Sequence, residues 1–158
     1  MLPFEGIRVV EIGSGTALAF CGKLFADFGA EVVKVEAPGG DPGRHSPPLV
    51  QTGDGRRESA YFAWLNTNKR SITADLQSEP GLARVRSIVA GSDIVLDARA
   101  LGEPGKQRAN LHDGNPNPRL VEVAFTWFGE SGPYSGYAGT EAVCRALAGV
   151  IHSAGPVE

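Results

Sequence analysis

Residues 8–36 read RVVEIGSGTALAFCGKLFADFGAEVVKVE, a segment in which a strand pattern gives way to a helix pattern and then returns. The β-branched run 8–12 ends at a glycine-rich turn, which is typical of a buried strand. A helix closed by Gly29 is predicted next, and its inner face recurs at helical spacing through Ala17, Cys21, Leu24, Phe25 and Phe28. A second strand is predicted at 31–36, so the opening forms a βαβ unit with a parallel strand pair.

The alternation of strands and helices continues along the chain. Further strands are predicted at 71–76, 93–97 and 119–125, and a helix is predicted from Ser78 to Gly91. The last helix carries its inner face at Val143, Ala146, Leu147, Val150 and Ile151. The pattern predicts an α/β fold in a single domain over 1–158, with a Rossmann-like, doubly wound, mostly parallel sheet flanked by helices. Ligand sites are expected at the carboxyl ends of the strands.

The composition of the chain argues against several classes of function. The chain has 158 residues, 42% of them apolar, and a net charge of −3 of mixed sign, which argues against nucleic acid as a partner. No leader and no run of about 18 apolar residues is visible, so a cytoplasmic protein without a membrane span is expected. Cys21 and Cys144 lie in apolar runs and are expected to be reduced core residues.

The region 37–59 is rich in glycine, proline and charge and is predicted to be a functional loop without structure of its own. Within it, 39–44 could bring a flexible backbone and Arg44 to an anionic ligand, because arginine binds phosphate through two donors. A surface turn with a solvated arginine is the alternative. The segment 61–65 is apolar enough to pack.

Two cations follow in the polar segment 66–71. Lys69 and Arg70 stand next to Asn68 and hydroxyl groups at the start of a predicted strand, an arrangement that suits a polyphosphate. The alternative is an exposed charged turn.

The segment 128–134 follows a strand directly. Its glycines, Gly129 among them, would let backbone N–H groups approach a carbonyl or carboxylate oxygen, with Tyr134 close by in sequence. A shaped turn is again the alternative.

A dinucleotide fingerprint is present in outline only. Gly13 and Gly15 stand between strand and helix, and Glu36 follows about 20 residues on, but the third glycine position is occupied by Leu18. NAD binding therefore remains an alternative to a plain tight turn.

Taken in order, six segments resemble the class III CoA-transferase family, which includes formyl-CoA, carnitine and bile-acid CoA-transferases and α-methylacyl-CoA racemases. They are 2–10, 24–36, 38–44, 65–72, 117–120 and 128–134. The resemblance implies a Rossmann-like domain that binds CoA rather than NAD, with Arg44, Lys69 and Arg70 on phosphates and the 129–134 turn near the thioester. It also implies an interlocked homodimer and an aspartate nucleophile downstream of the segment that matches 139–149.

The chain departs from the family pattern at 17–19 and at 97–100, where CoA contacts are put in doubt. Thr140 and Glu141 replace the racemase histidine and aspartate, which disfavours a racemase. We therefore expect an N-terminal CoA-binding portion of a transferase, without a catalytic residue or tightly bound cofactor of its own and with CoA or acyl-CoA as the substrate. The alternatives are a noncatalytic or degenerate module that acts with a partner chain and, third, an NAD-binding domain.

Overall fold

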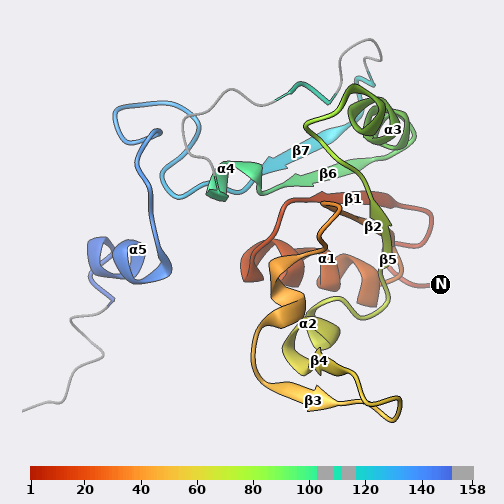
Figure 1. Ribbon diagram of the computed structural model, residues 1–158. Coiled ribbons are helices and arrows are strands. Elements are labelled where there is room, and N and C mark those ends of the chain that lie inside the picture. The colour runs from red at the N-terminus through yellow and green to blue at the C-terminus, as the bar shows by residue number, and fades with distance from the viewer. Residues whose placement is uncertain (103–108, 112–116, 151–158) are drawn as a thin grey trace, which may run out of the picture.

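A computed structural model describes residues 1–102, 109–111 and 117–150, and a five-stranded sheet is its centre (Figure 1). The strands are β1 (Arg8–Ile12), β2 (Glu31–Glu36), β5 (Arg70–Thr73), β6 (Ile94–Asp97) and β7 (Val121–Ala124). Their order is β5-β2-β1-β6-β7, and every neighbouring pair is parallel. This is the doubly wound order in which the strand sequence reverses beside β1. The predicted fold class is confirmed.

Helices cover both faces of the sheet. Because side chains alternate along a strand, β1 sends Val9 toward α1 (Thr16–Asp27) and Val10 toward α3 (Glu79–Ala90). The two apolar clusters that result are separated by the sheet, and each contains fully buried valines from several strands. The core thus consists of two layers around a buried sheet.

The buried face of α1 is rotated by part of a helical turn from the face that the sequence predicted, so this prediction is wrong. The helix buries Leu18 and Ala26, whereas Ala17, Leu24 and Phe28 are exposed. The helix is apolar around most of its circumference, so the 3.6-residue pattern fits more than one face. Small residues on the observed face let the helix lie close to the sheet.

The predicted helix ends are confirmed. Gly29 follows α1 with φ 104°, and the N–H of Ala30 bonds to the carbonyl of Phe25, which closes the helix as a left-handed glycine cap does. At α3, the Oγ of Ser78 accepts from the N–H of Gly81, and Gly91 is the C-cap.

The region 37–59 has structure of its own, contrary to the prediction. It contains the 3₁₀ helix η1 (Pro42–His45) and an antiparallel hairpin of β3 (Leu49–Gln51) and β4 (Arg57–Ser59). The hairpin turns at Asp54-Gly55, where Gly55 has φ 84°, a dipeptide that favours such turns. The segment 61–65 lies in α2 (Ala60–Leu65), which buries only Leu65.

The chain beyond β6 is more exposed. The short helix α4 (Arg99–Gly102) follows β6, and α5 (Glu141–Leu147) lies apart from the sheet in Figure 1. No residue of α5 is buried, so the inner face predicted there has no core to join among the described residues, and Ile151 falls outside them.

Two smaller observations complete the description. Both cysteines are free and half-buried; Cys21 packs against the apolar cluster beneath α1, whereas Cys144 lies on the exposed helix α5. Within the described part of the chain, no helix has the length and apolar character that crossing a membrane requires.

Candidate functional site at the carboxyl edge of the sheet

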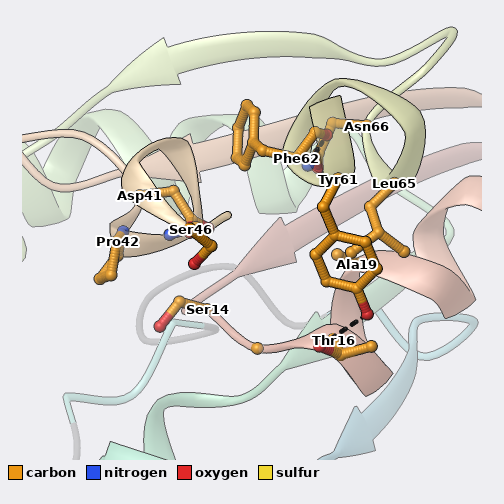
Figure 2. Close-up of a pocket in the computed structure, with 12 residues that line it drawn as sticks. Ser14, Thr16, Ala19, Asp41, Pro42, Ser46, Tyr61, Phe62, Leu65 and Asn66 are labelled. Carbon is orange, nitrogen blue, oxygen red and sulfur yellow. Dashed lines mark hydrogen bonds between the residues drawn. The ribbon is translucent and has the colours of Figure 1, made fainter. Parts of the chain in front are cut away.

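A cavity of about 250 Å³ lies beside the ends of β1 and β2 (Figure 2). Its walls come from three elements: the β1–α1 turn with the first turns of α1, the η1 segment, and α2. This is the edge at which doubly wound α/β proteins bind ligands. The position agrees with the expectation from the strand pattern.

The lining of this pocket is largely apolar, carries one carboxylate at Asp41 and is not basic. Hydroxyl and amide groups come from Ser14, Thr16, Ser46 and Asn66, and none of the lining side chains is a lysine or arginine. The hydroxyl of Tyr61 donates to Oγ1 of Thr16 at 3.3 Å and so joins α2 to the start of α1. The pocket offers hydrogen-bonding groups and aromatic surface rather than positive charge.

Four buried charged residues meet at the back of the pocket, and one of them, Asp41, also lines it. We call Glu11, Lys34, Asp41 and Lys69 the Glu11 cluster. Glu11 and Lys34 are register partners on β1 and β2, and Nζ of Lys34 lies 2.8 Å from Oε1 of Glu11. The same Nζ lies 2.7 Å from Oδ2 of Asp41, and Nζ of Lys69 lies 2.7 Å from Oε2 of Glu11. The charges of two cations and two anions therefore compensate one another away from water, as buried charges must.

The two lysines respond differently to this environment. Burial alone would lower the pKa of Lys34, but the charges of Glu11 and Asp41 outweigh burial and raise that pKa. For Lys69, burial prevails over the attraction of Glu11 and lowers the pKa. Lys34 is thus held as an ammonium from two sides.

Lys69 is a structural cation in this arrangement. Its side chain is only 2% exposed, and Nζ also donates to the carbonyl of Ala19 at 2.8 Å and to Oδ1 of Asn66 at 3.0 Å. Sequence reasoning missed this cluster. The signal was present, because Glu11 and Lys34 interrupt two apolar strands at positions that pair in a parallel register.

Arg44 lies at the same edge on a second ion pair. Its Nε and one terminal nitrogen each lie 2.7 Å from an oxygen of Glu36, and its guanidinium lies 4.4 Å from the ring centre of Phe62. The Arg44 guanidinium, with the Ser71 hydroxyl and the Asp41 N–H, lowers the pKa of Glu36 to about 2. The arginine side chain is still 45% exposed.

The other predicted phosphate contacts lie elsewhere. Asn68 donates to Asp27 at 2.9 Å, and Arg70 pairs with Glu31 at 2.7 Å. Glu31 begins β2 and Glu36 ends it, so Arg70 and Arg44 lie near opposite ends of one strand, about 16 Å apart along it. The structure does not gather the predicted cations at one point. Their contact with phosphate stays a prediction.

The glycine turn after β7 is exposed. Gly129 has φ 89°, and its N–H donates to Oγ1 of Thr126 at 2.7 Å. Tyr134 is 59% exposed, and its ring centre lies 5.4 Å from that of Tyr137. The role predicted for this turn near a thioester stays a prediction.

The glycine fingerprint is explained by packing. Gly13 has φ 102°, and a Cβ there would lie 2.9 Å from the backbone carbon of Ala98. The β1–α1 turn thus needs glycine in order to approach the chain after β6. In a dinucleotide-binding domain, Glu36 would be expected to bind a ribose. Here both of its carboxylate oxygens accept hydrogen bonds from protein donors.

Fold and site together define an α/β protein of the Rossmann-like class with a pocket at the carboxyl edge of a parallel sheet. The sequence profile of CoA-transferase family III matches residues 4–158, and the chain belongs to this family. The resemblance inferred from the six segments is thereby confirmed.

Two curated relatives show how much of such proteins this chain represents. It is 38% identical to the succinate–glutarate CoA-transferase of Agrobacterium fabrum, covering 97% of this chain and 39% of that protein. It is 40% identical to the succinyl-CoA–D-citramalate CoA-transferase of Chloroflexus aurantiacus, covering 94% of this chain and 36% of that protein. The chain therefore spans somewhat less than two fifths of their length.

Solved structures give the same result. A CAIB/BAIF family protein from Brucella suis superposes with a TM-score of 0.81 at 37% identity, over 94% of this chain and 40% of that one. The protein Rv3272 from Mycobacterium tuberculosis superposes with a TM-score of 0.79 at 30% identity, over 99% of this chain and 43% of that one.

Proposed function

We propose that this chain is the N-terminal CoA-binding portion of a family III CoA-transferase, and that CoA or an acyl-CoA binds at the carboxyl edge of its sheet. The family match over nearly the whole chain carries the proposal. The pocket at the edge where doubly wound sheets bind ligands supports it. We assign no catalytic residue to this chain, because an aspartate nucleophile would belong to the part of the family fold that follows it.

Arg44 is the phosphate contact we favour. It is partly exposed, follows the pocket-lining Gly43, and keeps a fixed orientation because two of its N–H groups donate to the carboxylate of Glu36. A guanidinium that is oriented in advance loses less conformational entropy when it binds a phosphate. The thioester end of the ligand would then extend toward the pocket, whose lining carries no cation, and the turn that holds Gly129 and Tyr134.

Arg70 and Asn68 are proposed as outer contacts of the same long ligand. Arg70 is 77% exposed and free to turn from Glu31. Lys69 is proposed to act indirectly, since its ammonium is enclosed by Glu11, Ala19 and Asn66. A joint replacement of Lys69 and Arg70 would mix the two roles, so Arg70 is tested alone.

Calorimetric titration with CoA tests these assignments. Arg44→Gln should weaken CoA binding by about tenfold, as the loss of one charged hydrogen-bonding contact does, and Arg70→Gln by less. Glu36→Gln breaks the same ion pair but keeps the guanidinium of Arg44. Comparing the two variants therefore shows whether CoA affinity depends on the guanidinium itself or on its pairing with Glu36. Arg56→Gln, on the exposed hairpin, is the neutral control. Equal affinities for Arg44→Gln and Arg56→Gln would remove Arg44 from the site.

We further propose that the chain associates with a second copy or with a complementary chain. Some relatives carry subunit names, such as the alpha subunit of a succinyl-CoA–L-malate CoA-transferase from Chloroflexus aurantiacus. Val143 and Leu147 of α5 are exposed apolar side chains that a partner could cover. Light scattering across a concentration series tests this: a mass that stays at one chain at all concentrations contradicts self-association. Co-expression with a second chain that carries the remaining part of the family fold then tests the complementary chain.

A further inference from the structure

The three walls of the pocket are held from behind by two lysines that share one carboxylate. Nζ of Lys69 donates to Ala19 on the α1 wall and to Asn66 on the α2 wall. Nζ of Lys34 pairs with Asp41 on the η1 wall. Glu11 does not line the pocket, yet its two oxygens bind these two lysines and so connect all three walls.

The η1 wall depends on this connection for its shape. One carboxylate oxygen of Asp41 binds Lys34, and the other accepts the N–H of Gly43 at 2.7 Å, which caps the 3₁₀ helix. The backbone N–H of Asp41 in turn donates to Glu36 at 2.9 Å. The position of Asp41, and with it the adjacent pocket wall, is therefore held by Lys34 at the side chain and by Glu36 at the backbone.

Glu11 cannot be replaced in this role by solvent or by a neighbour. Its side chain is fully buried, and α1 passes directly over it at Gly22, where a Cβ would overlap Oε2 of Glu11. Without its charge, Lys34 and Lys69 would face each other out of water, and like charges in that position repel strongly. The lysines would then withdraw from their wall contacts.

We propose that Glu11 is a positioning residue of the pocket: its charge fixes the α1, α2 and η1 walls in one arrangement, so that ligand binding depends on a residue that does not touch the ligand. The ligand part of this inference rests on the function proposed above. The part that concerns the walls does not.

Amide hydrogen exchange read by mass spectrometry, with CoA calorimetry on the same samples, tests this on the purified 158-residue chain. Glu11→Gln should raise exchange in 43–46 and 60–66 by about tenfold or more while α3 keeps its protection. It should also weaken CoA binding by about tenfold. Val85→Ala is the matched control, because it opens a cavity under α3 on the opposite face of the sheet and should loosen α3 without changing CoA affinity.

A second variant keeps the test decisive if Glu11→Gln does not fold. Asp41→Asn cuts only the η1 branch, so exchange should rise in 43–46 and stay unchanged in 60–66. Wild-type exchange of 43–46 in either variant, or of 60–66 in Glu11→Gln, would overturn the proposal, as would a rise spread evenly over the chain. If the wild-type chain binds no CoA, the proposed function fails, and the exchange pattern still decides the role of Glu11.

Discussion

Nζ of Lys34 lies 2.8 Å from Oε1 of Glu11, its register partner on the neighbouring strand, and both side chains are at most 2% exposed. Removing one partner of such a buried pair is strongly destabilising, because the remaining charge stays buried without a partner and without solvation.

Lys34→Met should destabilise the fold strongly, because it leaves the carboxylates of Glu11 and Asp41 buried without their shared cation. The expected loss in the free energy of unfolding is about 3–5 kcal/mol, measured by urea denaturation at neutral pH. Arg56→Gln, which removes an exposed ion pair with Asp54, should leave the free energy of unfolding nearly unchanged, because solvent screens exposed pairs. Similar small losses in both variants would contradict the structural role of the Glu11 cluster.

Gly22→Ala should also destabilise, although alanine is normally the better helix residue by about 1 kcal/mol. The added Cβ would overlap Oε2 of Glu11 and approach Nζ of Lys69. Thermal unfolding should therefore show a lower midpoint for this variant. Gly53→Ala, in open space on the hairpin, serves as the control and should leave the midpoint nearly unchanged. A stabilised Gly22→Ala variant would mean that α1 lies further from Glu11.

Acid should remove the contribution of the pair between Arg44 and Glu36. The pKa of Glu36 is lowered from 4.5 to about 2, so the folded state binds this proton less readily than the unfolded state does. The resulting stability is present above pH 4.5 and is lost as pH falls toward 2. In urea titrations at several pH values, the wild-type advantage over Glu36→Gln should shrink through this range. An advantage that stays constant with pH would contradict the assignment.

The sequence predicts local features well and long-range contacts poorly. Ser78, Gly29 and Gly91 mark the ends of helices through bonds to residues a few positions away, so their roles are visible in the sequence alone. The buried face of α1 is not visible in this way, because only the sheet decides which of its apolar sides is covered.

Lys69 illustrates the limit for the candidate site. It stands in a polar, turn-like segment that is typical of an exposed charge, but its partner Glu11 lies 58 positions earlier in the chain. The pairing exists only because β5 and β1 flank β2 in the same sheet. The hairpin in 37–59, by contrast, was predictable from Asp54-Gly55, a local signal.

Calorimetric titration of the wild-type chain with CoA, and with NAD in a parallel experiment, tests the central claim most directly. A CoA-binding domain predicts saturable heat with CoA and none with NAD, because the β1–α1 turn is shaped by packing and Glu36 is engaged by Arg44. Binding of NAD, or the absence of CoA binding by a chain shown to be folded, would contradict it.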